Sequence, residues 1–149
     1  IFLLVDSMLA LGTALQATGG ASYIASIILD LPFTDTPIAM ISVLFLLVAI
    51  TTNLLTNNAC AILFTPIAMD LAGSITVPDG FEYDIAFIFA LTVLFGANCS
   101  FASPIGYQTN LLVMGPGRYK FRDFIKAGVP LVLLLWITFT VMLKYYFGL

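Results

Sequence analysis

Residues 37–69 read PIAMISVLFLLVAITTNLLTNNACAILFTPIAM. Two apolar runs, 37–50 and 59–69, flank the segment 51–58, in which six of eight residues carry a hydroxyl or an amide. Apolar runs of about 10–14 residues are too short to cross a bilayer and are typical of re-entrant or broken helices. The pattern predicts a re-entrant helical hairpin over residues 35–73, with its tip in the polar segment.

A second polar interruption lies between residues 98 and 110. It separates the apolar run 85–97 from the short apolar run 111–114 and combines Asn, Ser, Gln and Thr with Pro104 and Gly106. Proline and glycine break helices and leave backbone carbonyl groups without their helical partners. The sequence therefore predicts a discontinuous helix over residues 85–115.

The composition is that of a membrane protein. Of the 149 residues, 61% are hydrophobic and 9% are charged, whereas soluble domains have about 45–50% and about 25%. We therefore expect an all-α polytopic membrane protein. Five Lys and Arg residues and a net charge of −3 leave no basic face for a nucleic acid. The sequence contains no histidine, which excludes imidazole general bases and histidine proton relays.

The two ends of the chain complete this architecture. Residues 127–148 predict a final transmembrane helix. Residues 1–31 predict the end of one helix followed by an interfacial helix kinked at Gly19 and Gly20. Because the sequence starts inside an apolar run, we expect it to be one piece of a longer protein. Four of the five basic residues lie between the broken helix and the final helix: Arg118, Lys120, Arg122 and Lys126.

This basic cluster predicts the orientation of the protein. Positively charged loops stay in the cytoplasm, so the final helix should leave the membrane on the outer side. We therefore expect an integral protein of the plasma (inner) membrane with its C-terminus outside.

The two polar breaks carry no charged side chain. Irregular backbone at membrane depth survives only inside protein or along an aqueous cavity. Hydroxyl, amide and carbonyl oxygens suit Na⁺, whereas helix N-termini near Ala59 and Gln108 offer amide donors to an anion. A purely structural use of these side chains as interhelical hydrogen bonds is the alternative. Proton coupling would need a carboxylate, for which Asp6 and Asp70 are the candidates.

The order of these motifs resembles that of the divalent anion/sodium symporter family, which includes sodium-coupled dicarboxylate, citrate and sulfate carriers. The resemblance implies an elevator-like homodimer with two inverted repeats, in which residues 1–149 are the C-terminal repeat. Na⁺, a small anion, membrane lipid and the N-terminal repeat of the same protein are the implied partners. The matching stretches are Thr56-Asn57-Asn58, Ala102-Ser103-Pro104, residues 115–124 and residues 11–25.

The resemblance also implies site residues. A sodium ion would be held by Thr52, Thr56, Asn57 and the carbonyl group of Ala102. The anion would face Asn57, Asn58, Ser103 and Pro104. Thr56 stands where the family motif has serine and keeps a hydroxyl, while Asn58 stands where the motif has threonine and exchanges a hydroxyl for an amide. Na⁺ is the implied coupling ion, and no cofactor, further metal or catalytic residue is implied.

Taken together, these features predict sodium-coupled secondary transport of a small divalent anion such as a dicarboxylate, citrate or sulfate. The alternatives are a proton-coupled or uncoupled anion carrier of the same superfamily and a non-transporting structural membrane subunit. An enzyme is not expected, because an intramembrane hydrolase using Ser100 or Ser103 would need a nearby Lys or His base.

Overall fold

A computed structural model describes residues 17–30, 36–75 and 83–147, together with residues 7, 10, 13 and 14. No strand occurs among these residues, which confirms the predicted all-α class for the described part of the chain. The helices are α2 (Gly20–Leu29), α3 (Pro37–Thr51), α4 (Asn57–Ser74), α5 (Ile85–Ala97), α6 (Gln108–Met114) and α7 (Phe121–Tyr146).

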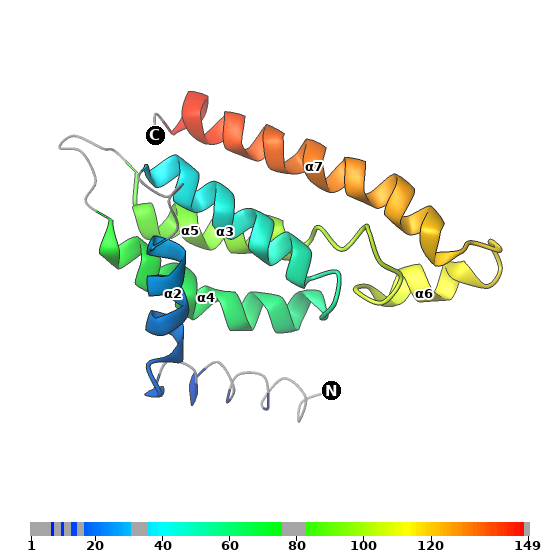
Figure 1. Ribbon diagram of the computed structural model, residues 1–149, viewed down its shortest axis with the longest axis horizontal. Coiled ribbons are helices and arrows are strands. Elements are labelled where there is room, and N and C mark those ends of the chain that lie inside the picture. The colour runs from blue at the N-terminus through cyan, green and yellow to red at the C-terminus, as the bar shows by residue number, and fades with distance from the viewer. Residues whose placement is uncertain are drawn as a thin grey trace.

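Helices α3 and α4 form the two arms of the predicted hairpin and run antiparallel on either side of a turn at residues 52–56 (Figure 1). Each arm begins after a threonine cap. The hydroxyl oxygen of Thr36 accepts a hydrogen bond from the backbone N–H of Ala39, and that of Thr56 accepts one from the backbone N–H of Ala59, each at 3.3 Å. Such a cap satisfies a backbone N–H of the first helical turn, which explains where each arm starts. That both arms reach the same membrane face stays a prediction.

The predicted broken helix over residues 85–115 is divided into α5 and α6 by the segment 98–107. Asp84 caps α5, because its Oδ1 accepts a hydrogen bond from the backbone N–H of Ala86 at 3.0 Å. Helix α5 packs against both hairpin arms. Gly96 permits its approach to α3, since a Cβ at this position would lie 3.0 Å from the Cβ of Val48.

Within the described residues, α7 is the one helix long and apolar enough to cross a membrane. It starts at Phe121, earlier than the predicted residue 127. The reason is local: the carboxylate of Asp123 accepts a hydrogen bond from the backbone N–H of Lys120 at 2.8 Å and stabilises the first turn. Two of the four basic residues, Arg122 and Lys126, therefore lie in the helix itself.

Polar contacts fix α7 to the first hairpin arm along its middle. The indole Nε1 of Trp136 donates to the backbone oxygen of Ser42 at 3.0 Å, and the hydroxyls of Ser42 and Thr140 lie 3.1 Å apart. These are the interhelical hydrogen bonds that isolated hydroxyls in membrane helices commonly form. The side chain of Trp136 therefore packs against α3.

The predicted kink in the N-terminal segment falls at Gly19, which has a left-handed φ of 70° and directly precedes α2. This backbone conformation favours glycine. Helix α2 packs against α4, and the hydroxyl of Ser22 donates to Oδ2 of Asp70 at 2.8 Å. Most of the segment ahead of the kink, including Asp6, lies outside the described residues, and an interfacial location of α2 stays a prediction.

The core shared by α3, α4 and α5 is apolar, with few polar side chains. Its fully buried large members include Ile41, Leu44, Phe45, Ile67, Leu71, Ile88 and Phe89. The buried polar side chains of the described chain are Ser42, Thr52, Thr92, Ser100 and Ser103. Three of these five, Thr52, Ser100 and Ser103, come from the two polar breaks, so buried polarity is concentrated where the helices are interrupted.

Candidate functional site

The two polar breaks touch each other through Thr52, whose side chain is 0% exposed. Its hydroxyl donates to the backbone oxygen of Ala97 at 2.7 Å and lies 3.0 Å from Oδ1 of Asn57. A single buried hydroxyl therefore joins the end of α3 to the end of α5 and to the first turn of α4. The sequence predicts that the two breaks form one site, and the fold brings them into contact.

Asn53 makes a second connection between the breaks. Its Nδ2 donates to the backbone oxygens of Ala49 at 2.7 Å and Cys99 at 3.1 Å. Its Oδ1 accepts a hydrogen bond from the backbone N–H of Ala102 at 2.8 Å. The side-chain amide therefore pairs with the loop after α5 through both of its polar atoms.

Side-chain donors hold three carbonyl groups of the second break, those of Cys99, Ser100 and Ser103. Asn110, in the first turn of α6, reaches back so that its Nδ2 donates to two loop oxygens at 2.9 Å and 3.1 Å. The carbonyl oxygen of Ala102, like those of Phe101, Pro104 and Ile105, has no hydrogen-bond donor among the described residues. Such an oxygen keeps its lone pairs for another partner. The backbone oxygens that accept hydrogen bonds from Thr52, Asn53 and Asn110 are that of Ala97 at the end of α5 and those of Cys99, Ser100 and Ser103 in the loop.

Gly106 brings the loop directly against the hairpin turn. A Cβ at this position would overlap the carbonyl oxygen of Thr52 and would lie 3.1 Å from both the Cα of Asn53 and the Cβ of Ser100. Two of these neighbours are backbone atoms, which cannot move aside as the end of a flexible side chain could. The sequence identifies Gly106 only as a helix breaker, whereas its packing role appears in the fold.

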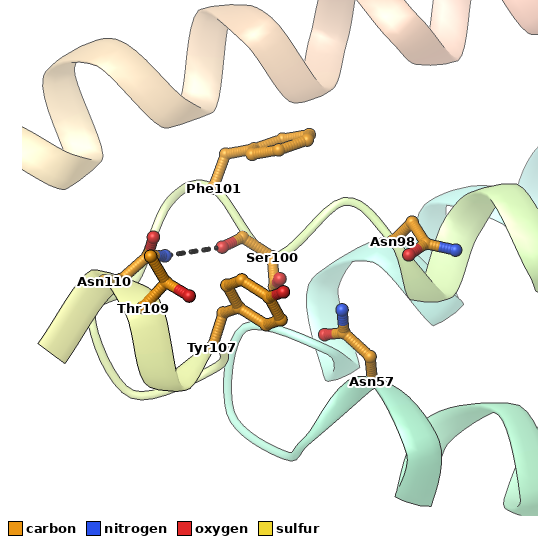
Figure 2. A pocket seen from close by; sticks show the side chains of 7 residues that line it. All are labelled: Asn57, Asn98, Ser100, Phe101, Tyr107, Thr109 and Asn110. Atoms are coloured by element: carbon orange, nitrogen blue, oxygen red, sulfur yellow. Dashed lines mark hydrogen bonds between the residues drawn. The ribbon is translucent and has the colours of Figure 1, made fainter. Parts of the chain in front are cut away.

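A cavity of about 240 Å³ opens beside this junction (Figure 2). Its walls come from the first turn of α4, the loop after α5 and the start of α6. Six of the seven lining residues carry an amide or a hydroxyl, and none carries a charge. Neutral donors and acceptors of this kind can orient an ion without supplying a fixed charge. The lining residues are Asn57, Asn98, Ser100, Phe101, Tyr107, Thr109 and Asn110.

The four residues implied for sodium occupy different positions around the junction. Thr52 and Asn57 are in contact, and Ala102 is connected to the same turn through Asn53. The hydroxyl of Thr56 is engaged as the cap of α4, where it accepts a hydrogen bond from the N–H of Ala59. The described residues contain no group of three His, Cys, Asp or Glu side chains that could hold a metal ion. A cation here would depend on neutral oxygens.

The residues implied for the anion are more dispersed. Asn57 lines the cavity, whereas Asn58, Ser103 and Pro104 do not. Asn58 is exposed. Ser103 is buried, and its hydroxyl accepts a hydrogen bond from the N–H of Ile105 at 3.1 Å, which stabilises the loop. The roles that the resemblance implies for these residues stay predictions.

Several residues at the junction had no role assigned from the sequence. Asn53 and Asn110 hold the loop backbone, and Tyr107 and Thr109 line the cavity opposite Asn57 (Figure 2). Their polarity within the breaks is visible in the sequence. Their partners are not, because the hydrogen bonds of Asn53 to the loop span 46 and 49 positions.

Several known proteins similar to this chain are named as transporters. A family model described as a citrate transporter matches residues 1–149. An uncharacterized transporter of Synechocystis sp. is 37% identical over 148 residues, which are 99% of this chain and 23% of that protein. An uncharacterized transporter of Escherichia coli is 32% identical over 145 residues, 97% of this chain and 23% of that protein.

A further relative is named for its substrates. Sodium/sulfate cotransporter 1 of Chlamydomonas reinhardtii is 31% identical over 150 residues, which cover 97% of this chain and 16% of that protein. The chain thus spans less than a quarter of the length of each of these three relatives.

Proposed function

The chain belongs to the citrate transporter family, and from that membership we propose that it forms part of the ion and anion site of a sodium-coupled carrier. It is part of an integral membrane transporter and not of an enzyme. Its resemblance to the divalent anion/sodium symporters is confirmed by the same matches. Within that frame, we propose that residues 1–149 are the C-terminal repeat of a homodimeric carrier.

One observation carries the proposal: two uncharged interruptions of apolar helices meet where Thr52 binds the backbone oxygen of Ala97 and Asn53 binds the backbone N–H of Ala102. A membrane protein that only needed to pack its helices would gain little from two irregular segments in contact, because irregular backbone needs protein or water around it. A binding site for a hard cation explains why both segments are irregular and lie in contact.

Thr52 can serve the cation while it keeps its hydrogen bond to the backbone oxygen of Ala97. The Thr52 hydroxyl has one proton, and its contact with the oxygen of Ala97 at 2.7 Å is shorter than its contact with Asn57 at 3.0 Å; donation to Ala97 leaves the lone pairs of the hydroxyl available. Its contact with Asn57 can then give way to Na⁺, which both oxygens would coordinate together with the Ala102 carbonyl. Thr56 would join this set when its hydroxyl is released from the cap of α4.

The amide of Asn57 can also connect the cation to the anion. Its oxygen lies toward Thr52, while its side chain lines the neutral cavity, where an NH₂ group can donate to a carboxylate or sulfate oxygen. A divalent anion in a site without basic residues is unfavourable at bilayer depth unless a cation offsets its charge. Binding of Na⁺ would therefore raise the affinity for the anion, which is the coupling that symport requires.

Of the two carboxylates that are candidates for proton coupling, Asp70 lies within the described residues. It is distant from the junction of the two breaks. It lies 13 residues beyond Asn57 on the same helix, about 20 Å along the axis. Its carboxylate is engaged by Ser22 of α2. This separation favours Na⁺ over a proton as the coupling ion at the junction.

Ion replacement in proteoliposomes tests the proposal on the full-length protein. We expect uptake of labelled sulfate, citrate or succinate to fall about tenfold when external Na⁺ is replaced by choline or K⁺, because the cation and the anion stabilise each other's binding. Undiminished uptake in choline would contradict sodium coupling and would favour the proton-coupled or uncoupled carrier. A protonophore would then separate those two alternatives.

A further inference from the structure

We propose that Asn53 is a positioning residue, whose side-chain amide fixes the loop after α5 so that the carbonyl oxygen of Ala102 can bind the coupling cation. The inference rests on the proposed sodium site and adds to it a residue that does not itself touch the ion. Asn53 precedes the motif Thr56-Asn57-Asn58 and belongs to none of the residue sets that the resemblance implies.

Asn53 makes more hydrogen bonds than are required to complete the end of α3. Its bond to the oxygen of Ala49 is local and would be enough to complete the end of α3. The other two bonds cross to the loop, from Nδ2 to the oxygen of Cys99 and to Oδ1 from the N–H of Ala102. A side-chain amide donates two protons from its nitrogen and accepts at its oxygen, whereas a hydroxyl has one proton to donate and an ionised carboxylate has none.

These bonds hold the backbone on the N-terminal side of the Ala102 carbonyl. On the C-terminal side, the oxygen of Ser103 is held by Nδ2 of Asn110 at 3.1 Å. The peptide group between residues 102 and 103 therefore lies between two hydrogen-bonded backbone groups. Its own oxygen accepts no hydrogen bond from any residue that the structure describes. Such an oxygen is preorganised for a ligand, because the backbone around it is already ordered and binding costs little further conformational entropy.

Substitution of Asn53 should therefore weaken cation binding selectively. In the full-length carrier, Asn53→Ala removes both bonds to the loop, and we expect the Na⁺ concentration for half-maximal uptake to rise about tenfold. The KM for the anion at saturating Na⁺ should stay within about twofold of the wild type, because the cavity side chains are intact once the cation is bound. A residue that merely stabilised the fold would lower the amount of active protein without moving the Na⁺ midpoint.

A second readout does not depend on transport. Ligands that bind the native state raise its melting temperature with a concentration dependence set by their affinity. We expect NaCl, compared with choline chloride, to raise the melting temperature of the purified wild-type protein. In Asn53→Ala the NaCl midpoint of this rise should shift upward about tenfold, in step with uptake.

Thr51 offers a matched control at the same helix end. It is half-buried like Asn53, but among the described residues its hydroxyl bonds only to the oxygen of Leu47 in its own helix. Thr51→Ala should keep the wild-type Na⁺ midpoint. If Asn53→Ala is poorly folded, Asn53→Ser replaces it, because a serine hydroxyl can keep a local bond to Ala49 but cannot reach the loop.

The outcomes separate the two proposals. A wild-type protein with neither Na⁺-dependent uptake nor a Na⁺-dependent melting shift would overturn the sodium site itself. A wild type with both responses, and an Asn53 variant with an unchanged Na⁺ midpoint, would overturn only the positioning role. A raised anion KM with an unchanged Na⁺ midpoint would overturn it as well, because the amide would then act on the anion.

Discussion

Replacing Gly106 with alanine should raise the Na⁺ concentration for half-maximal uptake about a hundredfold in the full-length carrier. The added methyl group would overlap the carbonyl oxygen of Thr52, with the Cα of Asn53 at 3.1 Å. Because backbone lies on that side, the loop has to withdraw from the hairpin turn. Overpacking and the loss of the Thr52 and Asn53 bonds together amount to about 3 kcal/mol, which corresponds to the expected change in affinity.

Gly73 provides the control for this substitution. It lies within α4, and a Cβ there would meet nothing within 4 Å. Alanine is favoured over glycine inside a helix by about 1 kcal/mol, so Gly73→Ala should leave uptake unchanged and stability unchanged or higher. Both variants should be compared for membrane expression and for the Na⁺ dependence of uptake. A Gly106→Ala carrier with the wild-type Na⁺ midpoint would show that the two breaks do not act as one site.

The fold was largely predictable because each helix is limited by residues close to it in the sequence. Polar residues at 51–58 and 98–110 shorten the apolar runs, and the caps at Thr36, Thr56 and Asp84 set the first turns of α3, α4 and α5. The start of α7 was placed too late, because its charged first turns look like a loop. A carboxylate at Asp123 allows the helix to continue beyond its apolar part.

The site was less predictable, because its geometry depends on partners far apart in the chain. Thr52 and Thr56 look equivalent in one polar run. Only the fold shows that Thr52 is buried against Ala97, 45 positions away, while Thr56 is exposed and caps α4. In the same way, nothing local distinguishes Asn53, which holds the loop, from Asn58, which is exposed. Polarity predicts where a site can be, and packing decides which side chains form it.

Replacing Thr52 with valine should raise the Na⁺ midpoint roughly thirtyfold. Valine preserves the shape of threonine, so the packing around this fully buried side chain changes little. The substitution removes one oxygen from the cation site and leaves the carbonyl oxygen of Ala97 without its donor. Loss of a polar contact to a charged ligand costs about 2 kcal/mol, which accounts for the size of the effect on Na⁺ affinity. Thr52→Ser keeps the hydroxyl and should restore most of the affinity.

Thr92 makes this test specific, because it is the same residue type at the same burial in a different setting. Both side chains are 0% exposed, but within the part of the chain that the structure describes the hydroxyl of Thr92 bonds only to the oxygen of Ile88 in α5. That oxygen keeps its helical partner when the hydroxyl is removed, so Thr92→Val should leave the Na⁺ midpoint of uptake unchanged. Equal effects of the two valine substitutions would mean that any buried hydroxyl matters alike. A difference confined to Thr52 would locate the cation where the interrupted helices meet.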